Sequence, residues 1–470
     1  MSKRQNTFLQ SVDLMTLSLY LSLLGIGWLM VYTVGYNEEL SFSETIFDLN
    51  TKVGKQTLWI GISLLALIVT ISVEWTFWRT FAYPIYGLGI AALLGVLLFG
   101  ITVKGATSWY SIGGFTLQPS EFAKFATCLA LAAFLSTYKT NLNNTNNVLI
   151  AFGILVLPMG LILLQPDAGS ALVFLSFIIL LFREGLSPSL IVFALATMTL
   201  LILGFIFPFY QMMVVFTLLI LLILFRSLVK DFKFMFGYFI IAGLALFFTY
   251  LGHPVYVLLG IGVLLLLFAY LNWAKRKESL VGKLSILLIM GTLVTGGANY
   301  TFNNVMRSHQ QDRINVWLRP HLCDPQGSLY NLIQSKMAIG SGGFQGKGFL
   351  NGEITKGGYV PEQDTDFIFC TIAEEQGFIG SLGIIGLFTL LILRILVIAE
   401  RQNSDFSRQY AYGFAGIVFI HFFVNIGMTM GLVPVIGIPL PFISYGGSSV
   451  LAFTIMFGVL LKLDTKRYIG

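Results

Sequence analysis

Five carboxylates lie close together where one long apolar segment of the sequence begins. They are Glu362, Asp364, Asp366, Glu374 and Glu375, in PEQDTDFIFCTIAEEQGFIGS (residues 361–381). A carboxylate inside or at the edge of hydrocarbon is costly, so such residues usually mark a functional site. Asp366 suits a reactive carboxylate at the membrane interface. The alternative is structural: Glu362 and Asp364 would be solvated loop charges, and Asp366 would cap the start of a helix.

The spacing separates Asp366 from the two glutamates that follow it. We expect a helix to begin at residue 366, with Thr365 or Asp364 as its cap and Asp366 in its first turn. Glu374 would then lie about 12 Å deeper, because a helix rises about 1.5 Å per residue. It would also lie about 80° further round the helix axis. Glu374 and Glu375 therefore suit internal polar pairing instead of the same reactive group.

A second polar motif, LQPSEFAKF (residues 117–125), combines an acid and a base. Pro119 fits the first turn of a helix, and Glu121 and Lys124 share one face because they are three residues apart. In one interpretation the two charges neutralise each other where the helix enters the membrane. In the other, Lys124 contacts an anionic ligand. A third motif, QPDAGS, puts Asp167 at the start of another apolar segment.

A fourth motif, GLVPVIGIPLPFISYGGSS (residues 431–449), breaks the helical pattern. Pro434, Pro439 and Pro441 forbid an unbroken helix, but the motif is too apolar for a free loop. Irregular backbone survives at membrane depth only where it is buried in protein or lines a cavity. We therefore expect a re-entrant or tightly packed segment, and we expect the four motifs to converge on one site.

These motifs are set in a chain made largely of apolar segments. Of its 470 residues, 56% are apolar and 11% are charged, which indicates a polytopic membrane protein. The long continuous runs predict an all-α fold with about fourteen transmembrane helices. They begin near residues 13, 57, 80, 121, 148, 168, 187, 211, 235, 254, 281, 366, 408 and 446.

The basic residues predict which connections face the cytoplasm. They gather in alternate connections, among them Arg79, Arg183, Arg226, Arg394, Arg401 and Arg408, and near both termini, as Lys3, Arg4, Lys466 and Arg467. By the positive-inside rule this side is cytoplasmic, with both termini inside. Asp366 and the other three motifs then face the outer side.

One outer connection, the polar stretch 301–365 before the twelfth helix, is far longer than the rest. It carries Arg307, Arg313, Arg319, Lys336, Lys347 and Lys356. A long loop can cross a membrane regardless of its charge. The alternative is that these cations meet an anionic partner at the outer surface, such as a phosphate or an acidic headgroup.

Other chemistries find no support in the sequence. It contains no nucleotide phosphate loop, no zinc-protease motif and no dinucleotide fingerprint. SGGFQGKG (residues 341–348) resembles a phosphate loop only loosely and would lie outside the cytoplasm. Cys128, Cys323 and Cys370 show neither paired nor metal-ligand spacing. His421, inside an apolar segment, indicates a packed polar group more than a ligand.

Seven segments of the sequence occur in the order that one known family has them. They are QPSEFAK, QPDAGS, QSKMAIGSGGFQGKGFLNG, PEQDTDFIF, AEEQGFIG, NIGM and PLPFISYGGSS. Together they resemble the SEDS family, the RodA and FtsW proteins of bacterial wall growth. DPQGSLYNLIQSKMAIGSGG and VPEQDTDFIF are closer to RodA, the elongation member, than to FtsW of division.

The resemblance implies a peptidoglycan glycosyltransferase that polymerises lipid II at the outer face of the cytoplasmic membrane. Lipid II is a disaccharide pentapeptide linked to undecaprenyl diphosphate. The family's catalytic acid maps to Asp366 and its functional lysine to Lys124. The expected substrate-binding residues are Gln118, Glu121, Lys124, Asp167, Lys347 and Ser444. The implied partners are a class B penicillin-binding protein and other proteins of the elongation complex, with no role for nucleic acid.

The implied reaction suits a single carboxylate. We hypothesise that Asp366 is a general base that deprotonates the acceptor 4-hydroxyl of N-acetylglucosamine. The diphosphate is already a good leaving group and needs charge stabilisation more than a proton. Lys124, Lys347 or Arg313 would supply that charge, or else a divalent cation, Mg²⁺ or Mn²⁺. The sequence predicts no protein metal site.

The sequence departs from the family pattern in two ways. Family members generally have ten helices, so about four helices appear inserted, and we divide the chain into 1–186, 187–300, 301–365 and 366–470. The first part holds six helices, the second the insertion plus one core helix, the third the outer loop and the fourth the C-terminal helices. Arginines common in the family are replaced by Ser108 and Thr116, so Lys104, Lys124 or a loop cation would serve instead.

Other functions remain open at this point. Many helices, intramembrane carboxylates and broken segments also describe a transporter, here a flippase for a lipid-linked precursor. A transporter needs a charged site near the midplane, whereas these motifs lie on one side. A division-specific polymerase and a scaffold that docks partners are the further alternatives.

Overall fold

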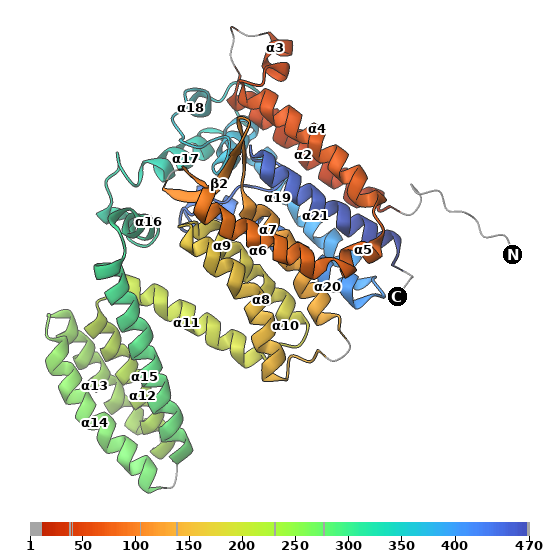
Figure 1. Ribbon diagram of the computed structural model, residues 1–470. Helices are drawn as coiled ribbons and strands as arrows, with labels where there is room; N and C mark the ends of the chain where they lie inside the picture. Colours follow the sequence, from red (N-terminus) through yellow and green to blue (C-terminus); the bar gives the residue numbers. More distant parts are fainter. Residues whose placement is uncertain are drawn as a thin grey trace. The chain divides into compact units, whose positions relative to one another are not determined.

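The computed structural model describes residues 12–36, 39, 41–103, 105–137, 140–229, 232–275 and 278–467 (Figure 1). Predictions that rest on Lys3, Arg4 or Lys104, or on the position of either terminus, lie outside these residues. The chain forms two compact units, one of residues 1–187 with 323–470, the other of Pro188–Leu322. The predicted four-part division stays a prediction.

Helices dominate the described residues, as the composition predicts. Eleven of the described helices are long and apolar enough to cross a membrane. Two shorter apolar helices, Ala168–Arg183 and Met235–Tyr250, and α7 (Pro119–Leu135) lie at the remaining predicted positions. The prediction of an all-α polytopic protein with about fourteen helices is therefore confirmed, although boundaries shift by a few residues.

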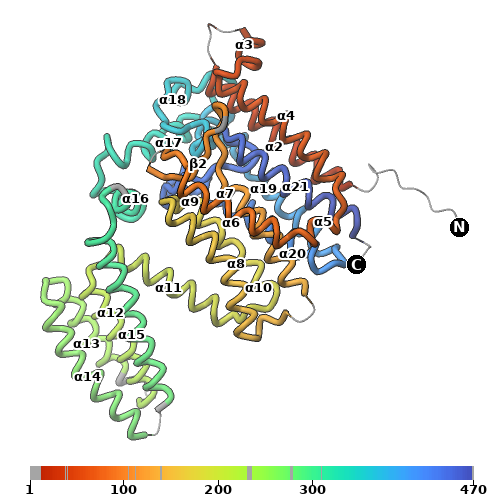
Figure 2. Tube along the Cα trace, in the orientation of Figure 1, coloured from red at the N-terminus to blue at the C-terminus, as the bar shows by residue number. Residues whose placement is uncertain are grey.

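The first unit contains the N-terminal and C-terminal helices. Its helices are α2 (Leu14–Val34), α3 (Phe42–Phe47), α4 (Lys52–Ser72), α5 (Trp75–Thr80), α6 (Ala82–Phe99), α7, α8 (Thr145–Leu164), α9 (Ala168–Val173), η1 (Phe174–Ser176), α10 (Phe177–Arg183), α17 (Tyr330–Ser341), α18 (Glu353–Lys356), α19 (Ile368–Glu400), α20 (Asp405–Met430) and α21 (Gly447–Thr465). Figures 1 and 2 show α7, from the first third of the chain, against α20 and α21. These three helices form the core of the unit.

Local sequence explains where several of these helices begin and end. Asp13 accepts a hydrogen bond from the Thr16 amide at 3.0 Å and so caps α2. Pro119 stands in the first turn of α7, where a missing amide hydrogen costs nothing. α20 ends at Gly431, whose φ of 77° is left-handed and favours glycine.

A small antiparallel sheet precedes α7, which the all-helical interpretation did not foresee. Its strands are β1 (Ile101–Val103), β2 (Ala106–Ile112) and β3 (Phe115–Leu117), in that order. Gly113 and Gly114 join β2 to β3 with φ values of 57° and 83°. Two residues with positive φ make the tight hairpin turn that suits twisted strands. The sheet leads the chain directly to Gln118.

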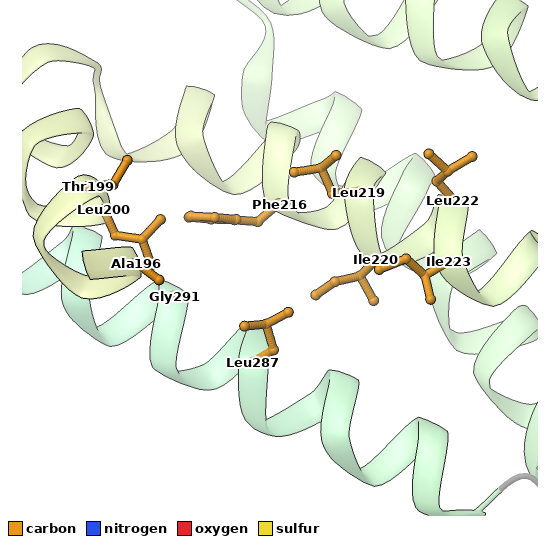
Figure 3. Close-up of a pocket in the computed structure, with 10 residues that line it drawn as sticks. All are labelled: Ala196, Thr199, Leu200, Phe216, Leu219, Ile220, Leu222, Ile223, Leu287 and Gly291. Carbon is orange, nitrogen blue, oxygen red and sulfur yellow. The ribbon is translucent and has the colours of Figure 1, made fainter. Parts of the chain in front are cut away.

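The second unit is a helical bundle. It contains α11 (Pro188–Ile206), α12 (Phe209–Leu228), α13 (Phe232–Tyr250), α14 (Pro254–Ala274), α15 (Glu278–Tyr300), the π-helical turn η2 (Thr301–Val305), α16 (Ser308–Leu318) and η3 (Pro320–Leu322). α12 packs against both α14 and α15. A pocket of about 460 Å³ lies among α11, α12 and α15, and Figure 3 shows its almost wholly apolar lining.

The predicted outer loop is not one irregular stretch. Residues 301–322 belong to the second unit, whereas 323–365 belong to the first and include α17 and α18. Arg319 illustrates the division, because its guanidinium lies 5.7 Å from the ring of Phe302 within the second unit. The cations of the predicted loop are therefore divided between the two units.

Candidate active site

Asp366 lies just before α19, not in its first turn. The helix begins at Ile368, close to the predicted start near residue 366. Its N-cap is Phe367, so the predicted cap at Thr365 or Asp364 was wrong. A turn delays the helix, because Glu362 has a φ of 57° and its carbonyl accepts hydrogen bonds from the amides of Thr365 and Phe367. Asp366 is half-buried at this turn.

Three consecutive main-chain carbonyls hold the turn in place. The carbonyl of Asp364 accepts from the Tyr445 amide at 2.7 Å, and that of Thr365 accepts from the Ser444 hydroxyl at 2.6 Å. The carbonyl of Asp366 accepts from the side-chain amide of Asn425 at 2.9 Å. The backbone of the candidate base is therefore fixed by α20 and by the segment that follows it.

Asp364 serves as an ion-pair partner instead of a helix cap. Its carboxylate lies 2.6 Å from the ammonium of Lys52, at the start of α4. The Asp364 side chain is almost fully buried, whereas Lys52 is exposed. Burial and the nearby Asp364 carboxylate raise the pKa of Tyr445 above its ordinary value. This part of the site is thus tied to the N-terminal helices as well.

The predicted irregular segment forms the wall beside Asp366. Residues 431–446 contain no helix, and residues 438 and 440–444 within them are buried. Gly437 has a φ of 77°, and a Cβ atom added to it would lie 3.0 Å from the Asp366 carboxylate. Glycine is required here both by the backbone conformation and by this close approach.

A polar cluster lies next to a glycine that packs against the same wall. Gln118 donates to the Asp167 carboxylate at 2.9 Å, and the Ser170 hydroxyl donates to it at 2.7 Å. Gly169 packs so tightly that an added Cβ atom would lie 2.9 Å from the carbonyl of Ile436. The structure therefore brings the predicted residues Gln118 and Asp167 to the segment that Asp366 also contacts.

Glu121 and Lys124 form a fully buried pair. The Lys124 ammonium lies 2.8 Å from Glu121 Oε1 and 2.9 Å from His421 Nε2. The exposed fractions of Glu121 and Lys124 are only 1% and 0%. The first interpretation, in which the two charges neutralise each other, describes this contact. A direct contact between Lys124 and an anionic ligand stays a prediction, because in this conformation neither charge reaches the surface.

His421 connects this pair to the wall. A lysine ammonium can only donate, so His421 accepts at Nε2 and carries its hydrogen on Nδ1. Nδ1 then donates to the carbonyl of Pro439 at 3.0 Å. The histidine is a packed polar group, as predicted, and a hydrogen-bonded chain runs from Lys124 to the segment beside Asp366.

Lys347 and Glu374 fasten the outer loop instead of facing Asp366. The Glu374 carboxylate accepts from the amides of Ile354 and Thr355, each at 2.9 Å, and from the Lys347 ammonium at 3.0 Å. The hydrogen bond with Glu374 raises the pKa of Lys347, with a smaller contribution from Glu353. The predicted polar pairing of Glu374 thus holds a loop, not the interior of the bundle.

The SGGFQGKG motif lies against a break in α19. Gly377 interrupts the helix with a φ of 63°, and the amides of Lys347 and Gly348 donate to the carbonyls of Glu374 and Glu375. A Cβ atom on Gly346 would lie 2.1 Å from the Glu375 carbonyl. The glycines of this motif therefore permit close backbone docking, which explains them without a phosphate.

Sequence reasoning missed Asn425, Gly437 and Lys52 as parts of the site. A signal existed for Asn425, because an amide inside an apolar span is costly unless it is hydrogen-bonded.

Ser108 is buried and Thr116 is exposed, so the two positions where the family has arginines differ in environment. Among the described residues, no group of three or more His, Cys, Asp or Glu side chains could hold a metal ion.

Comparison with known sequences identifies relatives along almost the whole chain. The family model FTSW_RODA_SPOVE, described as "Cell cycle protein", matches residues 14–220 and 223–469. The peptidoglycan glycosyltransferase RodA of Treponema pallidum is 31% identical, over 97% of this chain and 98% of its own. The peptidoglycan glycosyltransferase MrdB of Escherichia coli K12 is also 31% identical, over 87% and 84%.

Two solved structures share the fold. A chain from a peptidoglycan synthase complex has a TM-score of 0.62 and 22% identity, covering 98% of this chain and 99% of its own. The rod shape determining protein RodA of Thermus thermophilus has a TM-score of 0.56 and 21% identity, covering 98% of each chain.

Proposed function

The chain belongs to the FtsW, RodA and SpoVE family of cell cycle proteins, and from this membership we propose that it is a peptidoglycan glycosyltransferase. It is a multi-pass membrane protein. It polymerises lipid II into glycan strands at the outer face of the cytoplasmic membrane during cell elongation, and both termini face the cytoplasm. The names of the relatives support the reaction, and the pattern of basic residues supports the orientation.

The position of Asp366 carries the assignment of the general base. Its main chain is held by Asn425, and its carboxylate lies close to Gly437 in the irregular segment. A carboxylate fixed in this way can accept the proton of an incoming hydroxyl group. Attack on the anomeric carbon then expels the diphosphate, and a single displacement inverts the configuration of the sugar.

The other predicted residues take two different roles. Gln118 and Asp167 bind the sugars by hydrogen bonds, and Ser444 holds the turn at Asp366 through the Thr365 carbonyl. Glu121 and Lys124 act through His421, because their own charges are buried. Lys347 holds the outer loop in place through Glu374.

The developing charge on the diphosphate needs a cation, which an outer-loop basic group or Mg²⁺ or Mn²⁺ supplies. The described residues offer no cluster of three metal-ligating side chains. A divalent ion would therefore be held by one or two carboxylates together with the diphosphate oxygens, as Mg²⁺ commonly is. Asp366 is the carboxylate at the site that could share in this.

The proposed partner is a class B penicillin-binding protein that crosslinks the new strands. The structural relative from a peptidoglycan synthase complex, which couples polymerization to crosslinking, supports such an assembly. Other elongation proteins would join at the membrane.

The decisive experiment reconstitutes the purified chain with fluorescent lipid II, with and without the penicillin-binding partner. We expect glycan polymer from the wild type and none from Asp366→Asn. Asp405→Asn, which changes an exposed carboxylate at the opposite end of α20, is the matched control and should polymerise normally. Polymerisation by a folded Asp366→Asn variant would show that another group is the base.

A further inference from the structure

Asn425 binds two separate parts of the site with one nitrogen atom. It is completely buried in α20, and its Nδ2 donates to the Asp366 carbonyl at 2.9 Å and to the Ile438 carbonyl at 2.7 Å. A primary amide has two hydrogens on that nitrogen, so both are used. These contacts join the turn before α19 to the irregular segment after α20.

The orientation of this amide is determined by its surroundings. Asn425 Oδ1 is buried and has no hydrogen-bond partner among the described residues. Rotating the amide would place that oxygen against two carbonyl oxygens, which is repulsive. The side chain therefore loses one acceptor bond to keep two donor bonds, and leaving a buried acceptor unpaired is destabilising. Simple packing does not require such an arrangement.

His421 makes the neighbouring contact from the same face of α20. It lies one turn before Asn425, and residues four apart share a helix face. Its Nδ1 donates to the carbonyl of Pro439, directly after the Ile438 carbonyl that Asn425 binds. Lys124 fixes the histidine from the other side. One face of α20 therefore locates two successive residues of the wall.

The distance that matters is the one between the Asp366 carboxylate and the wall. Gly437 directly precedes Ile438, and an added Cβ atom there would lie 3.0 Å from Asp366 Oδ2. The Asn425 amide holds the main chain of Asp366 and the main chain of the wall at once. A change in the length of the Asn425 side chain, or in its hydrogen-bond donors, therefore changes the direction of the Asp366 carboxylate.

We propose that Asn425 is a positioning residue for the reaction: by clamping the carbonyls of Asp366 and Ile438, it sets the direction in which the Asp366 carboxylate meets the acceptor hydroxyl. The inference rests on the proposed function, in which Asp366 is the base. Misplacing a catalytic group by about 1 Å costs about 100-fold in rate. Substrate binding depends on other contacts and is largely retained.

The test measures polymerisation of fluorescent lipid II by the full chain carrying Asn425→Asp or Asn425→Ser. Asn425→Asp keeps the shape but replaces both donors with an acceptor, and Asn425→Ser removes them without adding a charge. We expect kcat to fall about 100-fold while KM stays within about threefold. Asn425→Gln, which retains the amide, should recover part of the lost kcat.

Thr429→Val is the matched control. Thr429 is also completely buried, one turn further along α20, but its hydroxyl donates only within the helix, to Ile426. We expect this variant to polymerise at the wild-type rate. It separates a general loss of packing in α20 from the loss of the clamp.

The outcomes distinguish the inference from the function on which it rests. If the wild type polymerises and Asp366→Asn does not, the function stands. A wild-type kcat in both Asn425→Asp and Asn425→Ser, or an equal loss in Thr429→Val, would then overturn the positioning role. If the wild type itself makes no polymer from lipid II, the proposed function fails and the inference fails with it.

Discussion

The two ends of α19 use carboxylates in different ways. At its C-terminal end, Asp13 and Asp464 accept hydrogen bonds through their side chains from Arg401, and Asp13 also pairs with Arg394 at 2.7 Å. At its N-terminal end, residues 364–366 accept hydrogen bonds through their main-chain carbonyls. The ion-pair cluster (Asp13, Arg394, Arg401 and Asp464) joins the ends of three helices.

This difference separates a structural role from a chemical one. In the ion-pair cluster the charge itself makes the contact, and Asp13 and Asp464 are almost fully buried. At the start of α19, hydrogen bonds to main-chain carbonyls hold the backbone of residues 364–366. A carboxylate on a backbone that is held in this way can accept a proton in a fixed geometry.

The largest effect should come from breaking the ion-pair cluster with Arg401→Leu. Two buried carboxylates would lose a partner at once, which costs about 3 kcal/mol of unfolding free energy because their charges stay buried. Thermal unfolding in detergent would measure this. Arg408→Leu is the control, since Arg408 pairs with the exposed Asp405 and should matter much less. Equal losses of stability in Arg401→Leu and Arg408→Leu would show that the ion-pair cluster contributes no more than the pair of Arg408 with Asp405.

Gly437→Val should disrupt the site at the N-terminal end of α19 without unfolding the protein. The added side chain meets the Asp366 carboxylate, and valine is strained at a φ of 77°. We expect a loss of polymerisation of about 100-fold, or about 2.7 kcal/mol in transition-state stabilisation. Gly87→Ala in α6, where an added Cβ atom has no neighbour within 4 Å, is the control. Unchanged activity in Gly437→Val would remove Gly437 from the site.

Acid should weaken the ion-pair cluster in a defined pH window. Burial raises the pKa of Asp13, but hydrogen bonds from Arg394, the Thr16 amide and Arg401 outweigh it and lower the pKa to about 2. A lowered pKa means that the stabilisation is complete above the unfolded value, near 3.8, and is lost as the pH falls towards 2. We expect about 2 kcal/mol to disappear in this window.

The measurement compares the wild type with Asp13→Asn. The wild type should be the more stable at pH 6, and the two melting temperatures should converge as the pH falls from 4 to 2. A difference that is constant with pH would contradict the assignment of the stabilisation to the Asp13 charge.

The smallest effect on stability should come from Lys52→Met, which removes the ion pair with Asp364 near the N-terminal end of α19. The Lys52 side chain is 59% exposed, so solvent screens its attraction to Asp364. We expect a loss of stability of at most about 1 kcal/mol. A loss as large as that of Arg401→Leu would mean that side-chain charge holds both ends of α19, and the comparison would fail.

Much of the fold could be predicted because it depends on local patterns. Hydrophobic runs predict where helices lie, and three prolines between Pro434 and Pro441 predict the irregular wall. The clustering of four outer motifs predicts one site, which stays a prediction, and the structure places Gly169 and Asp366 close to neighbouring residues of the irregular segment. These predictions need only the residue types and their spacing along the chain.

Other features could not be predicted because they depend on distant contacts. Lys124 and His421 lie 297 residues apart in sequence, and no local pattern shows that the lysine is buried against the histidine. The SGGFQGKG motif was compared with a phosphate loop, although its glycines serve the docking of backbone at Gly377. Glycine permits both phosphate binding and close backbone packing, and only the group that lies next to the motif in the folded protein distinguishes them.

By itself, the sequence determined that this protein is a membrane-spanning helical bundle, and it predicted one reactive carboxylate placed among broken segments. Apolar runs and helix-breaking residues act over a few residues, so the helices and breaks that they cause can be predicted from sequence alone. Only the tertiary structure decided which acids form buried ion pairs and which groups hold the main chain of Asp366. Burial and hydrogen bonding are properties of neighbours in space, and Asn425 and Ser444, which hold Asp366 and Thr365, lie 59 and 79 residues further along the chain.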